Sequence, residues 1–277
     1  MQKHGKLIWV LLLQMAVFWP VWRWYFSRMT YSPEELPGLI GIFVALFLIW
    51  FNNRSFRIQE PGRKRAQCIP FVWLIVFNTI YFLTYPFSPP LIRAIIAVYG
   101  IGFTLTSYIL GNGWHLGILG LFILGLPIIP TLQFYLGFPM RWFVGTVTVP
   151  LLNLSGFSVS LSGTCLDWCG KLIMIDAPCS GVKMLWSGLF LIFTLIGLYH
   201  TSFIQSTLAF IFTIAVILFG NILRSAALFY LEAGVIQAPP WAHEGFGLVS
   251  FFIAVCLIYL GFQRIRGNHL CTDILSI

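Results

Sequence analysis

Three polar side chains in separate apolar stretches of the chain are of the types that take part in acyl transfer. The first is Cys179, in the segment IDAPCSGVKMLW. We expect Asp176 to cap a helix whose first turn includes Pro178, so that Cys179 lies at the helix start. The partial positive charge and unpaired N–H groups there favour a thiolate, and the same donors can hold an oxyanion. The alternative is that Cys179 is a small buried residue that only packs.

Two charged residues flank Cys179. Asp176 lies close before it, and helix capping accounts for this carboxylate better than acid catalysis does. Lys183 follows Cys179 by four residues, on the same face of the expected helix. There it would attract a substrate carboxylate or increase the thiolate content. The alternative for Lys183 is that its amine only extends to the aqueous surface.

The second candidate is Arg224, inside the apolar run FGNILRSAALFY. A charged side chain within a membrane segment is costly, so it usually faces a partner or a wet cavity. Arg224 lies seven residues before the end of its expected span, about 10 Å deep at 1.5 Å per residue. Asn221 is one turn away on the same face. The alternative is that Arg224 extends outward or pairs with an acid such as Glu232.

The third candidate is His243, in the loop PPWAHEGFGLVSFF before the last apolar run. Histidine is the side chain best suited to gain and lose a proton near neutral pH, although a single loop histidine is usually only solvated. A thiol, an imidazole and a fixed cation are together what cysteine-based acyl transfer needs.

The composition indicates an integral membrane protein. Hydrophobic residues make up 59% of the 277 residues and charged residues 9%, against about 25% charged residues in an ordinary soluble domain. The first apolar run is too long for a signal peptide, so we expect a retained anchor. We predict an all-α fold, with residues 1–277 forming one polytopic membrane domain. Eight stretches are apolar enough to cross a ~30 Å hydrocarbon core, near residues 7–26, 37–51, 68–85, 91–111, 116–136, 180–199, 203–231 and 245–263.

The net charge of +8 is distributed unevenly between the expected loops. With eight spans and a cytoplasmic N-terminus, the C-terminus is also cytoplasmic, and this side carries an excess of +7 while the other side keeps +1. Topology and contact with anionic lipid explain this asymmetry, so we expect no nucleic-acid partner. The same orientation puts Cys179, Arg224 and His243 on the extracytoplasmic side at similar depth. The excess comes from nine basic residues against two acidic ones: Lys3, Lys6, Arg54, Arg57, Arg63, Lys64, Arg65, Arg264 and Arg266 against Glu60 and Asp273.

Residues 137–180 form the longest stretch without an expected span, and this topology makes them extracytoplasmic. The part MRWFVGTVTVPLLNL is typical of an interfacial or re-entrant piece, and FSVSLSGTCLDWCGKLIMID contains two β-rich runs that predict a small hairpin. Cys165 and Cys169 could form a disulfide or remain two free thiols. With only Asp167 nearby they do not supply a zinc ligand set, so we expect no metal.

At the three candidate positions the sequence resembles the exosortase/archaeosortase family of integral membrane transpeptidase-like enzymes. The sequence PCSG, which contains Cys179, Ser180 and Gly181, is similar to the family's nucleophile motif, with Pro178 where alanine is usual. NILR, from Asn221 to Arg224, matches the family's Asn-x-x-Arg motif. His243 stands where bacterial exosortases carry their third catalytic residue, which favours the bacterial branch. The resemblance is clearest over residues 145–262, the expected catalytic core region.

The resemblance implies an enzyme of the bacterial inner membrane that processes C-terminal sorting signals of the PEP-CTERM kind. Cys179 would attack a peptide carbonyl, release the hydrophobic tail and hold the remainder as a thioester, which an unknown amine acceptor or water resolves. No cofactor is needed. Family descriptions make the arginine a proton donor, but a guanidinium gives up a proton poorly at pH 7. We expect Arg224 to bind the oxyanion or orient the substrate carbonyl and His243 to move protons, while Asn221 holds Arg224 or the substrate backbone.

The main alternative is a non-enzymatic membrane protein, either a transporter or an envelope assembly factor. In that case Arg224 would line a polar pathway and Cys179 would pack. A transporter often shows two related halves or paired broken helices, and the sequence has no such internal symmetry.

Overall fold

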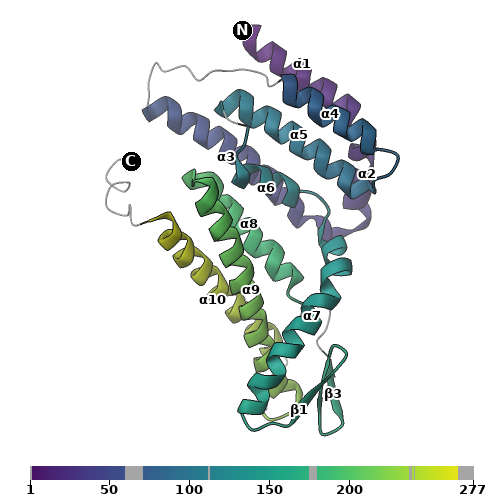
Figure 1. Ribbon diagram of the computed structural model, residues 1–277, viewed down its shortest axis with the longest axis vertical. Helices are drawn as coiled ribbons and strands as arrows, with labels where there is room; N and C mark the ends of the chain where they lie inside the picture. Colours follow the sequence, from purple (N-terminus) through teal and green to yellow (C-terminus); the bar gives the residue numbers. More distant parts are fainter. Residues whose placement is uncertain are drawn as a thin grey trace. The chain divides into compact units, whose positions relative to one another are not determined.

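The computed structural model describes residues 2–59, 71–111, 113–174, 180–236, 239 and 241–267. Helices dominate, and a small sheet lies between α7 and α8 in the chain order (Figure 1). The chain divides into two compact units. The first consists of Met1–Ile128 and Phe193–Thr201, and the second of Ile129–Ile192 and Ser202–Ile277. All of the candidate site residues belong to the second unit.

The first unit is a bundle of helices held together by glycine contacts and a few buried polar groups. Its helix α6 packs against α3 and α5. A Cβ on Gly41 of α3 would lie 3.0 Å from the Leu121 carbonyl oxygen of α6, so the two backbones are nearly in contact. The hydroxyl of Tyr25 donates to the Gly125 carbonyl at 3.1 Å. The helices are α1 Gln2–Val17, α2 Trp19–Tyr31, α3 Pro37–Gln59, α4 Phe71–Thr84, α5 Pro90–Leu110 and α6 Leu116–Leu124, with a 3-10 turn at Pro33–Glu35.

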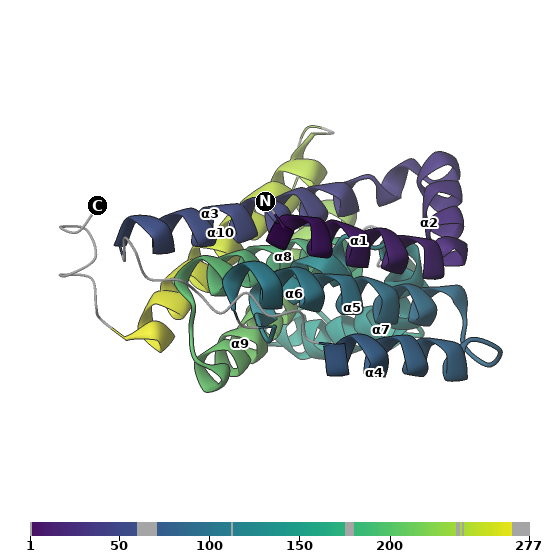
Figure 2. The same cartoon turned by 90° about the horizontal axis from the view of Figure 1, so that it is seen from above.

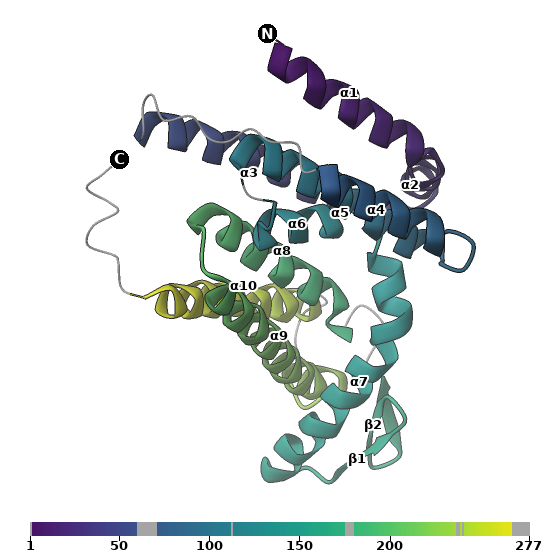
Figure 3. The same cartoon turned by 45° about the horizontal axis from the view of Figure 1, so that its top comes forward.

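The second unit combines helices α7 to α10 with a three-stranded sheet. Small residues seven apart on α10 lie against α9, which runs beside it (Figure 3). Gly247 contacts Arg224, and Ala254 approaches Gly220. Such small residues let membrane helices approach closely. The elements are α7 Ile129–Leu154, β1 Val159–Ser162, β2 Cys165–Trp168, β3 Lys171–Met174, α8 Val182–Tyr199 (in this unit as far as Ile192), α9 Phe203–Glu232 and α10 Ala242–Arg266.

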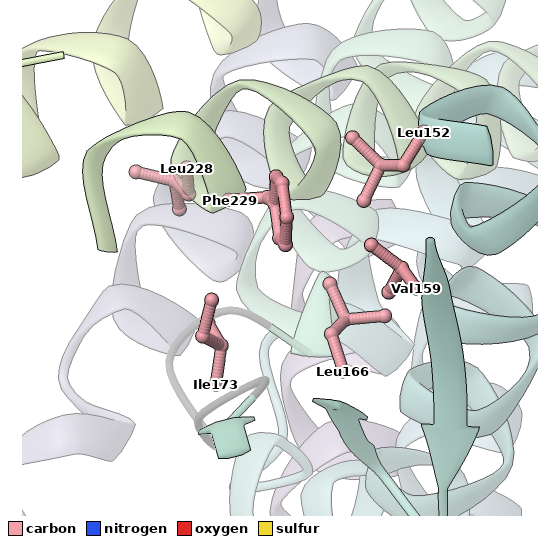
Figure 4. Close-up of a cluster of buried hydrophobic side chains, with 6 residues drawn as sticks. All are labelled: Leu152, Val159, Leu166, Ile173, Leu228 and Phe229. Atoms are coloured by element: carbon pink, nitrogen blue, oxygen red, sulfur yellow. The ribbon is translucent and has the colours of Figure 1, made fainter. Parts of the chain in front are cut away.

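The sheet is antiparallel, in the order β1-β2-β3, and packs against α7 and α9. One side chain from each strand points into a shared core (Figure 4). The side chains of this core are all less than 10% exposed, so the sheet is anchored on the last turns of α9. They are Val159, Leu166 and Ile173 of the sheet, Leu152 of α7, and Leu228 and Phe229 of α9.

The prediction of a helical membrane protein is confirmed in its main feature, but the count of eight spans is not. Five helices are long and apolar enough to cross a membrane: α3, α5, α8, α9 and α10. The predicted span 7–26 is the pair α1 and α2, which bend by 72° (Figure 2). The predicted span 116–136 is also interrupted, because α6 and α7 bend by 94°. If each bent pair is one span, the described residues contain up to seven, and α4 has only 14 residues.

The segment before α8 consists of a helix followed by the sheet. MRWFVGTVTVPLLNL is the C-terminal part of α7, which contains Pro139 and Pro150, and the break before α7 is compatible with the predicted re-entrant piece or with a broken span. A proline inside a helix removes one hydrogen bond, and packing of α7 against α9 and β1 compensates for that cost. The prediction was a two-stranded hairpin, whereas the structure has a three-stranded sheet in which Lys171–Met174 pairs with β2.

Candidate functional site

Gly181 adopts a backbone conformation that only glycine takes up easily. Its φ is +85°, and it directly precedes α8, which begins at Val182. A Cβ at this position would lie 2.8 Å from Nδ2 of Asn221, so the α9 side chain is packed against the glycine backbone. The predicted helix, capped by Asp176 and with Cys179 at its start, does not continue through Gly181, and α8 begins at Val182. Asp176 and Cys179 themselves lie outside the described residues.

Ser180 is buried and tied to α7. Its hydroxyl donates to Oε1 of Gln133 at 3.0 Å and accepts from the backbone N–H of Val182 at 3.4 Å. Gln133 did not emerge from the sequence as a site residue. The sequence feature that could have identified Gln133 is its amide side chain inside the apolar run PTLQFY, because such a side chain in a membrane protein usually makes an internal polar contact.

Asn221 and Arg224 lie one turn apart on α9. Asn221 is fully buried against Gly181, and the guanidinium of Arg224 lies against Gly247 of α10, where a Cβ would be 3.1 Å from Nη2. Within the part of the chain that the structure describes, Nε of Arg224 is buried without a hydrogen-bond partner. No ion pair between Arg224 and Glu232 is formed there, so the expected pairing is wrong.

Arg224 also lines an apolar cavity of about 240 Å³ between α9 and α10. The other lining residues are hydrophobic or small except for Ser250. A fixed cation at the edge of an apolar cavity can bind a single negative charge strongly, because little water competes for it.

His243 lies in the first turn of α10 and faces the end of α9. Its Nδ1 is 3.4 Å from Oε1 of Glu232, and Lys171 of β3 donates through Nζ to the main-chain carbonyl of Glu232. These three residues and Ser225 line a cavity of about 180 Å³, together with apolar side chains of β2, β3 and α9.

The described residues of the three motifs make two pairwise contacts. Gly181 contacts Asn221, and Arg224 contacts Gly247, which is one turn after His243. Arg224 and His243 line two different cavities of the second unit. Lys183 is exposed, whereas Ser180 and Gly181 beside it are buried.

The two cysteines of the sheet region are not bonded to each other. Cys165 and Cys169 are both free, so of the two alternatives for this pair the disulfide is not formed. Across the described ranges, no group of three or more His, Cys, Asp or Glu side chains is arranged to hold a metal ion.

Replacing Gly181 with alanine should destabilise the second unit. A side chain at positive φ costs about 1–2 kcal/mol, and the new Cβ must also displace the amide of Asn221. We expect a lower midpoint of thermal unfolding in detergent. Gly220→Ala is the matched control, because a Cβ there meets its nearest neighbour at 3.6 Å in a helix and should be neutral or stabilising. Equal midpoints for the two variants would contradict this account of Gly181.

Comparison with known proteins extends the similarity beyond the three motifs. The family model described as transmembrane exosortase (Exosortase_EpsH) matches residues 29–260. This range includes Cys179, Asn221, Arg224 and His243, and it begins well before the region where the motif resemblance is clearest. No curated protein and no solved structure matches the chain. Because the family model covers most of the sequence, the chain belongs to the transmembrane exosortase family.

Proposed function

We propose that this protein is a membrane cysteine transpeptidase or endopeptidase that cleaves C-terminal sorting signals of the PEP-CTERM kind. Membership of the exosortase family implies a membrane cysteine peptidase or transpeptidase with a sorting-signal substrate. The observation that carries the finer proposal is the packing of Gly181 against Asn221, since it joins the cysteine motif to the helix that bears Arg224.

Cys179 is the nucleophile in this proposal. Its thiol proton passes to His243 as the sulfur attacks the scissile carbonyl, and Arg224 binds the oxyanion of the tetrahedral intermediate. When the C–N bond breaks, His243 returns the proton to the departing amine of the tail, and the remaining acyl group is a thioester. An incoming amine or water gives a proton to His243 as it attacks the thioester, and the departing sulfur recovers that proton.

The start of α8 supports the placement of the nucleophile. The first hydrogen bond of this helix runs from the N–H of Leu185 to the Gly181 carbonyl at 2.8 Å, so the positive end of the helix dipole lies at Gly181. That partial positive charge would favour a thiolate on a cysteine three residues before Val182.

The proposed location is the inner membrane of a bacterium, with both termini in the cytoplasm and the site on the extracytoplasmic face. This orientation follows from the excess of basic residues in the expected cytoplasmic loops. It requires an even number of spans, which the seven together with the shorter apolar helix α4 would provide. Sorting signals of exported proteins would reach such a site after translocation of the protein that carries them.

A trapping experiment tests the intermediate and the orientation together. Spheroplasts making the protein and a reporter with a PEP-CTERM-like tail are treated with hydroxylamine, which should resolve the thioester and leave a C-terminal hydroxamate detectable by mass spectrometry. Pre-treatment with a membrane-impermeant maleimide should block processing by alkylating Cys179. The assay uses a Cys165→Ser, Cys169→Ser background, since both of these thiols are free. Absence of the hydroxamate while processing continues would exclude the thioester route.

A further inference from the structure

Glu232 connects the sheet, the end of α9 and the start of α10. It is the last residue of α9, and its main-chain carbonyl accepts a hydrogen bond from Nζ of Lys171. A lysine amine at a helix C-terminus is favourable, because that end carries partial negative charge. Its carboxylate, in contrast, faces Nδ1 of His243 at 3.4 Å. The backbone contact fixes the position of the residue, and the side chain is available for another role.

The contribution of this pair to stability is small. The side chains of His243 and Glu232 are 40% and 54% exposed, and an exposed ion pair typically contributes about 0–1 kcal/mol. The fold does not depend on the carboxylate, since the sheet is held by its apolar core and by the main-chain contact to Lys171. A functional role would therefore appear as a change in rate rather than as loss of the protein.

The pair also faces a cavity that a substrate can enter. Lys171, Ser225, Glu232 and His243 are its polar lining residues, and the rest of the wall is apolar. On α10 itself, the exposed carboxylate of Glu244 is the next acidic group, and the guanidinium of Arg224 lies one turn along the helix at Gly247. The carboxylate of Glu232 lies in contact with the imidazole of His243.

We propose that Glu232 is a positioning residue that orients His243 for proton transfer. A carboxylate at Nδ1 selects the neutral tautomer whose hydrogen is on Nδ1 and whose lone pair is on Nε2, so that Nε2 exchanges the proton with the substrate. It also stabilises the imidazolium that forms in each half of the reaction. A separation of 3.4 Å is long for a hydrogen bond, but such contacts often tighten when substrate binds. The inference rests on the proposed function.

Steady-state kinetics in proteoliposomes test this role, with a recombinant reporter ending in a PEP-CTERM-like tail as substrate. Glu232→Gln should lower kcat about 10- to 100-fold, the usual effect of removing a hydrogen-bond partner that orients a functional histidine, and leave KM within about twofold. Glu232→Asp keeps the carboxylate and should recover most of the lost rate. Glu244→Gln is the matched control, since it removes an exposed acid next to His243 in the same turn of α10, and its kcat should equal that of the wild type. Rates are expressed per molecule of folded enzyme.

A double-mutant comparison separates orientation from a merely structural effect. If Glu232 acts through His243, adding Glu232→Gln to His243→Ala should cause no further loss of kcat. Losses that multiply in the double variant would overturn the inference, as would a wild-type kcat in Glu232→Gln.

Failure of the inference is distinguishable from failure of the proposed function. In the same assay Cys179→Ala reports on the chemistry itself. If Cys179→Ala is inactive while Glu232→Gln has the wild-type kcat, the positioning role is wrong and the proposed function stands. If Cys179→Ala remains active, the proposed function is wrong and the positioning role fails with it.

Discussion

Replacing Cys179 with alanine should reduce removal of the C-terminal tail from a reporter protein by at least about 1,000-fold, because loss of a catalytic nucleophile typically costs this much or more. The methyl group of alanine cannot form the thioester, and neither an imidazole nor a guanidinium nearby can take the place of the sulfur–acyl bond. Cys179→Ser should also be severely impaired, since a hydroxyl is far less acidic than a thiol. Both variants can be followed by the size shift of the reporter on gels and by mass spectrometry of its C-terminus.

The sheet supplies the matched controls for this experiment. Cys165 and Cys169 are free thiols in the same unit, and Cys169 is exposed. Cys165→Ser and Cys169→Ser should process the reporter within about twofold of the wild-type rate, the scatter expected for surface substitutions. Processing at the wild-type rate by Cys179→Ala would remove the enzymatic interpretation and favour a non-enzymatic membrane protein.

The helices that carry the candidate site could be predicted from the sequence because the bilayer imposes their length. The predicted spans for α8, α9 and α10 differ from the structure by at most three residues at either end. A chain that crosses hydrocarbon must satisfy its backbone groups within the segment, so an apolar run of that length has few alternatives to a helix.

The breaks and the short strands were harder to predict, because tertiary packing decides them. LGLPII contains one glycine and one proline among apolar residues, which is compatible with a continuous kinked span or with the break between α6 and α7. KLIM has no alternation of polar and apolar residues, and it becomes β3 because Ile173 completes the core against Leu166 and Phe229.

The partners of the polar side chains also depend on the folded structure. The sequence suggests Glu232 as an ion-pair partner of Arg224, but the two residues are eight apart on α9, about 12 Å along the helix axis. The carboxylate instead contacts the imidazole of His243. Glu232 is the last residue of α9 and His243 lies in the first turn of α10, so the two side chains come from helix ends that lie close together. Composition and periodicity cannot reveal such a contact, because it depends on where two separate helices end relative to each other.

Replacing Arg224 with leucine should lower the rate of processing about 100- to 1,000-fold, the effect of removing one oxyanion donor, without lowering thermal stability. Nε of Arg224 is buried without a hydrogen-bond partner among the described residues, and the side chain lines an otherwise mostly apolar cavity. An unsatisfied charged group in such surroundings opposes folding, so an apolar residue of similar reach should be neutral or stabilising. Arg224→Lys keeps the charge but loses the planar fork of donors, and should recover only part of the rate.

The combination of lower activity and unchanged or higher stability distinguishes a catalytic arginine from a structural one. A structural arginine would show the reverse, with a lower unfolding midpoint in detergent and activity that falls only in proportion to the folded protein. Arg264→Leu is the control, because Arg264 is exposed in the last turn of α10, at the opposite end of that helix from His243. It should leave the processing rate unchanged. If Arg224→Leu instead unfolds at a clearly lower temperature and its folded fraction processes the reporter normally, then Arg224 supports the packing of α9 on α10 and takes no part in binding the oxyanion.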